Sequence, residues 1–177
     1  MKTLEGYAAR PTSDRVKESL FNIIMEYLAD AYVLDLYAGT GSLGIEALSR
    51  GARLAVFVDK SVKSTGLIKE NLINTKLIDR GIVIKGEIFN VLYGFFQKEV
   101  KFDIIFLDPP YNKGLAEETL KVIGKENMLS ANGIISTETG SNENIPLEIG
   151  TLQLVSHRKY GNTALAFYKK QQNMSKA

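Results

Sequence analysis

Short apolar runs alternate with amphipathic stretches along most of the chain. The apolar runs are rich in Val, Ile, Leu and Phe and have the length of buried strands. We expect strands at 32–37, 54–59, 81–86, 102–108 and 133–138, and helices at 13–28, 42–51, 61–76, 88–97 and 115–124. Strands that alternate with helices in this way form a parallel sheet with helices on both faces. The pattern therefore predicts an α/β fold.

The C-terminal part has a different pattern. "TLQLVSHRKY" and "TALAFYKK" are both strand-like, and the Gly161-Asn162 pair between them is typical of a tight turn. We therefore expect an antiparallel hairpin to complete a mostly parallel sheet of seven strands. No repeat or linker divides the chain, so one domain over 1–177 is expected, with an N-terminal segment and helix (1–30) and a polar tail (169–177) that frays.

Composition removes several classes of chemistry. The chain has 177 residues with a net charge of +2, which neither requires nor excludes a nucleic-acid partner. It has no cysteine, so thiolate metal sites and thiol nucleophiles are excluded. Its one histidine, His157, cannot form a histidine-rich metal site, and we expect no metal. No run has the length of a membrane span and no signal-peptide pattern is present, which favours a cytoplasmic protein.

A glycine-rich loop follows the first strand. "DLYAGTGSLG" places Gly39, Gly41 and Gly44 in the G-x-G-x-x-G spacing between a strand and a helix. Such glycines let the backbone turn tightly and approach a ligand, so a side chain at Gly41 is expected to block the ligand's path. Asp59 ends the next strand, where a carboxylate can accept hydrogen bonds from ribose hydroxyls. The loop indicates a nucleoside-binding site; a nicotinamide cofactor, or a tight turn without a ligand, are the alternatives.

A second motif, "FLDPPYN", runs an apolar strand into Asp108 and then into two prolines. Pro109 and Pro110 end the strand and fix the direction of the carbonyls around them, and Tyr111 follows. A strand terminator with a turn aspartate is the simple interpretation. In an open parallel sheet, however, this strand lies beside the first, at the switch point where ligands bind. Asp108, the glycine loop and Asp35 are then expected to face one crevice, where Asp35 can bind the amino group of an amino-acid-like ligand.

The motifs together resemble a known family. "RPTSDRVKESLFNII", "VLDLYAGTGSLGIEALSRGA", "FDIIFLDPPYNKGL" and "YGNTAL" are similar to the bacterial RsmD family, over residues 10 to about 168. That family transfers a methyl group from S-adenosylmethionine to N2 of guanine 966 in 16S ribosomal RNA. The resemblance implies a Rossmann-like class I S-adenosylmethionine-dependent methyltransferase fold. It also implies 16S ribosomal RNA, free or within an assembling small subunit, as the partner, and we expect a monomer.

The resemblance also implies residue roles. The amino-acid end of the cofactor falls to Asp35 and the glycine loop, the ribose to Asp59, and the adenine to Glu87, where relatives usually carry aspartate. The residues expected around the cofactor are Asp35, Ala38, Gly39, Thr40, Gly41, Asp59, Lys60, Glu87, Ile88 and Asp108. Asp108, Pro109 and Tyr111 are the expected catalytic residues. Arg10, Thr12 and Arg15 are expected to cover the cofactor or to contact RNA phosphate, with a plain surface charge as the alternative for Arg15. Asn112 and Gly161 are expected to line the base pocket, and Arg158 to bind the RNA.

The chemistry of an exocyclic amine explains the second motif. The lone pair of such a nitrogen is delocalised into the ring, so the amine is a poor nucleophile. Asp108 and the Pro109 carbonyl can each accept one N–H, which orients the nitrogen and stabilises the charge that develops on it. Tyr111 can stack on a base that is swung out of its helix or loop.

Other functions remain as alternatives. An adenine-N6 or cytosine-N4 DNA methyltransferase usually adds a target-recognition region, for which this chain has little room. Cytosine-C5 methylation is excluded because it needs a cysteine nucleophile. A small-molecule methyltransferase, a nicotinamide dehydrogenase and a non-catalytic nucleotide-binding or RNA-binding module explain the acceptor motif less well.

Overall fold

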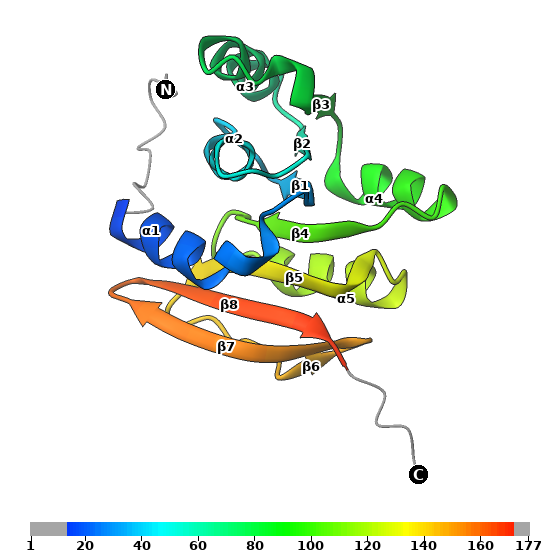
Figure 1. Cartoon of the computed structure of the whole chain (residues 1–177). Coiled ribbons are helices and arrows are strands. Elements are labelled where there is room, and N and C mark those ends of the chain that lie inside the picture. Colours follow the sequence, from blue (N-terminus) through cyan, green and yellow to red (C-terminus); the bar gives the residue numbers. More distant parts are fainter. Residues whose placement is uncertain (1–13, 172–177) are drawn as a thin grey trace.

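The computed structural model describes residues 14–171. An eight-stranded sheet forms the centre, with strand order β3-β2-β1-β4-β5-β8-β7-β6 (Figure 1). The strands are β1 (Tyr32–Leu36), β2 (Leu54–Asp59), β3 (Gly81–Lys85), β4 (Phe102–Leu107), β5 (Leu129–Gly140), β6 (Glu148–Ile149), β7 (Leu152–Tyr160) and β8 (Thr163–Lys170). The helices are α1 (Asp14–Ile23), α2 (Ser42–Ser49), α3 (Val62–Asn74), α4 (Ile88–Gln97) and α5 (Leu115–Lys125), with 3₁₀ turns at Met25–Tyr27 and Ile78–Arg80.

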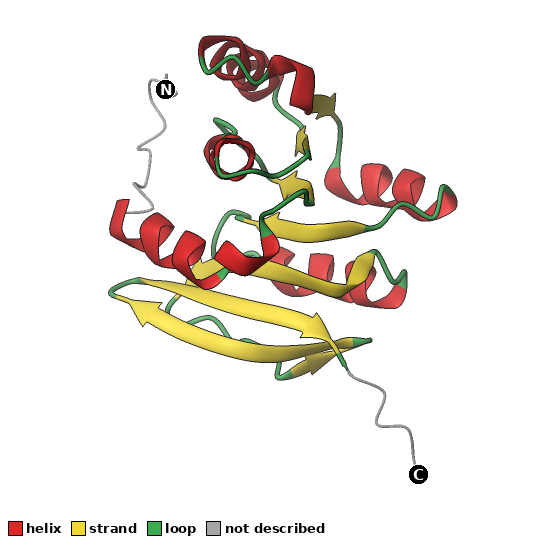
Figure 2. Ribbon diagram, in the orientation of Figure 1, coloured by secondary structure: helices red, strands yellow, loops and turns green. Residues whose placement is uncertain are grey.

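Strands β1 to β5 are all parallel, and β8 is antiparallel to β5. The β7–β8 hairpin therefore lies along the last parallel strand and closes that side of the sheet (Figure 2). Parallel strands are joined through helices, because the chain must return to the opposite edge before it can start the next strand. The predicted fold class is thus confirmed, and the carboxyl ends of β1, β2, β4 and β5 share one edge of the sheet.

Two apolar clusters hold the helices on the two faces of the sheet. One cluster joins α1, α2 and α3 to side chains such as Phe57 and Phe106, and the other joins α4 and α5 to side chains such as Leu36 and Ile105. Side chains alternate between faces along each strand, so neighbours in sequence enter different clusters. Both faces of the central strands are buried, which explains why β1, β2 and β4 are almost entirely apolar rather than alternating.

The structure differs from the sequence-based expectations at the ends of elements. Glu148 and Ile149 pair with Gln153 and Leu152, which adds the short strand β6 and makes eight strands rather than seven. Lys169 and Lys170 belong to β8 and pair with β7, so the strand continues past the point where fraying was expected to begin. Among residues 14–171, no helix could cross a bilayer; the longest, α3, has 13 residues and spans about 20 Å.

Candidate functional site

Four carboxylates lie along the carboxyl edge of four adjacent strands. Asp59 ends β2, Asp35 lies in β1, Asp108 follows β4 and Glu138 lies near the end of β5. Each lies an even number of residues along the chain from a strand residue in the cluster under α1, α2 and α3. Because side chains alternate between the faces of a strand, all four are directed to that side of the sheet. We call Asp59, Asp35, Asp108 and Glu138 the carboxylate row. Three of its members were expected from the sequence, and the topology brings all four to one edge.

Asp35 is the most buried member, with 2% of its surface exposed. Its Oδ2 accepts a hydrogen bond of 2.9 Å from the backbone N–H of Gly44 in α2. The pKa of Asp35 is raised to about 8, mainly by burial. The hydrogen bond from the Gly44 N–H lowers the pKa, and the charges of Asp108 and Asp59 add to the rise. A cationic group placed beside Asp35 would favour its ionised form. The environment of Asp35 therefore suits a positively charged ligand.

The glycine loop is held from both sides by neighbouring elements. Asp59 accepts hydrogen bonds from the backbone N–H groups of Gly39 at 2.9 Å and Ser61 at 2.8 Å, which ties the loop to the start of α3. The buried Asn71 of α3 donates its amide N–H to the carbonyl of Thr40 at 3.0 Å. Each carboxylate oxygen has a further lone pair, so Asp59 can still accept from a ligand hydroxyl. The loop is therefore preorganised within the chain itself.

The three loop glycines serve different purposes. A Cβ on Gly44 would lie 2.3 Å from the Phe57 ring, so this glycine lets α2 pack on β2. A Cβ on Gly41 would lie 3.2 Å from Ile68 of α3 and 3.4 Å from Ile45 of α2, so it would point into the packing between these helices. For Gly39, with φ of +54°, the only atom of residues 14–171 within 4 Å of such a Cβ is the Tyr37 carbonyl oxygen, at 3.9 Å. Gly39 is thus the glycine with open space beside it, where a ligand can approach the backbone.

The other residues expected around the cofactor directly follow β1, β2 and β3 in the chain. Ala38 is buried and donates its N–H to the carbonyl of Val58, across from β1 to β2. Glu87 is the exposed residue before α4, and the neighbouring Gly86 N–H bonds the Asp59 carbonyl at 3.1 Å, which brings Glu87 beside Asp59. Lys60 is exposed next to Asp59, whereas Ile88 is buried with 6% exposure in the cluster under α4 and α5.

The acceptor motif turns away from the sheet directly after β4. Asp108 is partly buried, Pro109 is buried and Pro110 is exposed. Tyr111 is partly buried; its hydroxyl donates to Glu138 Oε1 at 2.5 Å and lies 3.3 Å from the Thr163 hydroxyl. A Cβ on Gly140 would lie 3.5 Å from the Tyr111 ring, so the ring lies against the end of β5.

The pKa of Tyr111 is raised, first by burial and then by its hydrogen bond to Glu138. Because the phenol stays protonated, its O–H remains a donor and keeps the ring in one orientation. Tyr111 therefore presents a fixed aromatic ring beside Asp108.

The residues expected to contact RNA are divided between two places. Asn112 and Gly161 are exposed at turns, with φ of +58° and +59°, near the site. Arg15 on α1 and Arg158 on β7 are exposed and line one groove. Arg10 and Thr12 lie outside the described residues.

Sequence reasoning missed several residues that shape the site. Glu138 is 5% exposed, and its position near the end of the fifth strand, opposite Asp108, was the available signal. Tyr37 precedes Ala38 with φ of 60°, an unusual value for a bulky residue, and its hydroxyl lies 2.9 Å from that of Thr119 in α5. Thr163 and Asn71 have roles that depend on contacts between distant segments.

Comparison with known proteins agrees with this arrangement. A Bacillus subtilis (strain 168) protein with the provisional name rRNA methyltransferase YlbH is 38% identical over 170 residues, which are 96% of this chain and 92% of the relative. The Haemophilus influenzae protein named Ribosomal RNA small subunit methyltransferase D is 35% identical, over 92% of this chain and 88% of its own. The solved structure of a conserved hypothetical protein of Streptococcus pyogenes matches with a TM-score of 0.80 at 35% identity, covering 88% of this chain and 95% of that one.

The family described as "Conserved hypothetical protein 95" matches residues 1–169. The sequence motifs pointed to the same group, since a relative at 35% identity carries the name of the RsmD methyltransferases. The chain therefore belongs to this family.

Proposed function

We propose that the protein is a ribosomal RNA methyltransferase and that it methylates the exocyclic N2 amine of a guanine in 16S ribosomal RNA. The assignment as a ribosomal RNA methyltransferase is supported by family membership and by relatives named as ribosomal RNA methyltransferases. The guanine N2 target is supported by the position of Asp108 and Pro109 beside the aromatic ring of Tyr111, which Glu138 holds in place. This arrangement suits a planar amine on a flat base.

The residues present fit S-adenosylmethionine as the methyl donor, which supplies an electrophilic methyl group on a positively charged sulfur. Open space beside Gly39 allows a ligand to approach the loop backbone. Asp35 suits the ammonium group, because a cation offsets the cost of keeping its buried carboxylate ionised. Asp59 would hold the ribose hydroxyls and Glu87 the adenine amine, with Ala38, Thr40, Gly41, Lys60 and Ile88 around them.

Asp108 and Pro109 supply the acceptors for the reacting amine. In the proposed arrangement, the Asp108 carboxylate and the Pro109 carbonyl each accept one N–H of the base, and the nitrogen lone pair then points at the methyl group. S-adenosylmethionine held at the glycine loop would supply the methyl group, its sulfur would keep the electrons of the broken bond, and one N–H proton would leave to water. A carboxylate so placed stabilises the positive charge on nitrogen, and this stabilisation exists only as the bond forms.

Tyr111 provides the surface on which the base rests. A base inside a folded RNA cannot reach the edge of the sheet, so the target nucleotide must leave its stack. Stacking on an aromatic ring repays part of that cost, typically about 1–3 kcal/mol per base. Because the Tyr111 hydroxyl is bound to Glu138, the ring is already oriented before the base arrives.

The test uses the full chain with unmodified 16S ribosomal RNA, alone and in partly assembled small subunits, and S-adenosylmethionine with a labelled methyl group. Nucleoside mass spectrometry should detect N2-methylguanosine at one position. The Asp108→Ala variant is the control for a contaminating activity. Label in N6-methyladenosine or N4-methylcytidine of a DNA duplex would instead identify a DNA enzyme, and an absence of label in every substrate would indicate a binding module.

A further inference from the structure

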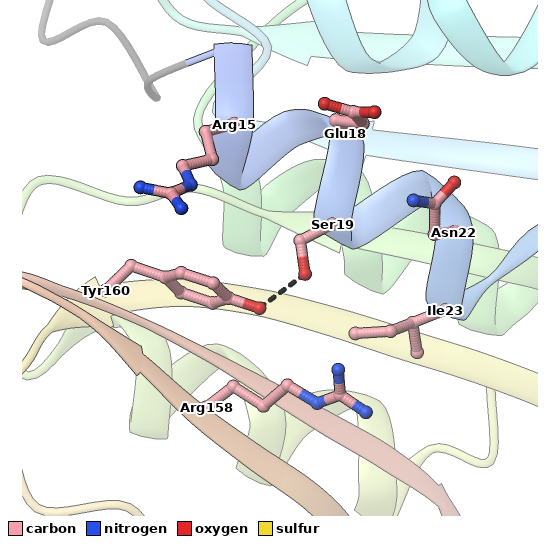
Figure 3. Close-up of a pocket in the computed structure, with 7 residues that line it drawn as sticks. All are labelled: Arg15, Glu18, Ser19, Asn22, Ile23, Arg158 and Tyr160. Carbon is pink, nitrogen blue, oxygen red and sulfur yellow. Dashed lines mark hydrogen bonds between the residues drawn. The ribbon is translucent and has the colours of Figure 1, made fainter.

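A groove separates α1 from the C-terminal hairpin, on the same face of the sheet as the carboxylate row. Its volume is about 650 Å³, and it is lined by Arg15, Glu18, Ser19, Asn22, Ile23, Arg158 and Tyr160. The α1 residues recur at spacings of three and four, so they form one helical face, and Arg158 and Tyr160 share one face of β7. We call this the α1–β7 groove (Figure 3).

The groove carries two guanidinium groups, those of Arg15 and Arg158. Within residues 14–171, no ion pair involves Arg15 or Arg158. In Figure 3, Arg15 lies toward the Tyr160 end of the groove, and the Arg158 guanidinium extends toward the Ile23 end. The Glu18 carboxylate lies on the side of α1 away from Arg158. Guanidinium groups bind phosphate through paired N–H donors, so Arg15 and Arg158 offer donors for anions at two separate points of the groove.

The walls of the groove are fixed to each other and to the site. The hydroxyls of Ser19 and Tyr160 are hydrogen-bonded, which joins α1 to β7 (Figure 3). Tyr160 pairs with Thr163 across the hairpin, and the Thr163 hydroxyl lies 3.3 Å from that of Tyr111. The hairpin turn also meets the end of β5, where the Ser141 N–H bonds the Asn162 carbonyl at 2.9 Å. One end of the groove therefore reaches the edge where Asp108 and Tyr111 lie.

We propose that the α1–β7 groove binds the phosphate backbone of the RNA strand that adjoins the target nucleotide, through Arg15 and Arg158. This proposal rests on the proposed function. A nucleotide swung into the site remains joined to its neighbours, so their phosphates must lie within a short distance of Tyr111. Contacts to those phosphates fix the position of the strand without reading its sequence. The groove thereby sets which nucleotide can reach Asp108.

The experiment measures the affinity of unmodified 16S ribosomal RNA against salt concentration for Arg15→Gln, Arg158→Gln and the double variant. Each lost phosphate contact should reduce the slope of log affinity against log salt by about 0.7–0.9, and the double variant by about twice that. Arg158→Lys should keep most of the slope, because it keeps the charge. Arg53→Gln is the matched control, since Arg53 is exposed at the opposite edge, beside Tyr32.

Methyl transfer is measured on the same variants. The RNA concentration for half-maximal rate should rise at least several-fold in the double variant, while the rate at saturating RNA and the affinity for S-adenosylmethionine stay near wild type. If the wild type methylates RNA but the groove variants have the salt slope of Arg53→Gln, the groove proposal is wrong and the proposed function stands. If the wild type binds RNA with the predicted slopes but transfers no methyl group, the groove stands and the proposed function is wrong.

Discussion

The Tyr111 hydroxyl donates a hydrogen bond of 2.5 Å to the buried carboxylate of Glu138, linking the loop after β4 to the end of β5. This bond fixes an aromatic ring beside Asp108 in a segment that otherwise has no regular structure. A ring held in this way presents its face to a base without first losing rotational freedom. We therefore make separate predictions for the Tyr111 ring and for its hydrogen bond to Glu138.

Removal of the ring should cost more than removal of its hydroxyl. Tyr111→Ala should lower kcat/KM for RNA by about 10- to 100-fold, because a stacked base contributes about 1–3 kcal/mol. Tyr111→Phe and Glu138→Met should each cost less, and their effects should not add, because each change removes the same hydrogen bond. A double-mutant cycle on methyl-transfer rates measures this. Additive losses from the two changes would show that Glu138 acts separately from Tyr111.

Asp108 should be needed for transfer rather than for cofactor binding. We expect Asp108→Ala to lower kcat by about 100-fold or more, because the group acts mainly in the transition state. Titration calorimetry should find S-adenosylmethionine affinity within a few-fold of wild type. Asp103→Asn is a suitable control, because Asp103 is the second residue of the same strand, at the opposite edge, and its Oδ2 accepts from the Tyr32 N–H at 2.9 Å. Near-normal turnover in Asp108→Ala would contradict the proposed role.

The glycines of the loop should respond differently to alanine. Gly44→Ala should destabilise the fold by about 1–3 kcal/mol or more, because its Cβ would overlap the Phe57 ring. Gly39→Ala should cost about 1–2 kcal/mol from its left-handed backbone and should also weaken S-adenosylmethionine binding, because its Cβ would occupy the open space. Urea unfolding and calorimetry separate the two effects. Unchanged affinity in folded Gly39→Ala protein would place the ligand elsewhere.

The buried carboxylate of Asp35 should leave a signature in the dependence of stability on pH. Its pKa is about 8 in the folded chain against an ordinary value of 3.8, so between these values the folded state holds one more proton than the unfolded state. The Asp35 contribution to stability is therefore full below about pH 4 and is lost as pH rises toward 8.

Asp35→Asn removes this titration and keeps an oxygen that can accept from the Gly44 N–H. Relative to the variant, the wild-type free energy of unfolding should fall with a slope that approaches about 1.4 kcal/mol per pH unit between pH 5 and 7. Urea unfolding across this range measures the difference. Parallel curves for the two proteins would mean that Asp35 is ionised throughout.

Much of the architecture could be predicted because the alternation of strands with helices and the helical periodicity are both visible in local sequence. The strand-and-helix alternation gave the parallel sheet, and the bounds of α4 agree with the periodicity from Ile88 to Gln97. The strand β6 could not be found, since two residues carry no period and are ordered only by pairing with β7. Likewise, the predicted helix over 13–28 becomes α1 and a 3₁₀ turn, because packing rather than periodicity decides where it ends.

Some residues of the candidate site could likewise be predicted from local sequence, and others depend on contacts between distant segments. Asp35, Asp59 and Asp108 follow recognisable motifs at strand ends, so their shared edge could be predicted from topology. Glu138 has no such motif, and its role depends on Tyr111 reaching across from another strand. The direction of a side chain at Gly41 depends on where Ile68 of α3 lies, which local sequence does not determine.

The carboxylate row gives the molecule an uneven charge distribution. Asp35 holds its proton at neutral pH, but Asp59, Asp108 and Glu138 lie at the same edge of the sheet. Because the chain carries a net charge of +2, positive charge is in excess over the rest of the molecule. A polyanion is repelled from that edge, whereas a cation or a neutral ring is admitted. An RNA that presents a single unstacked base can thus insert the base while its backbone is kept outside. The same electric field would disfavour free nucleotides. Their phosphate groups are only a few bonds from the base and would have to enter the acidic edge together with it.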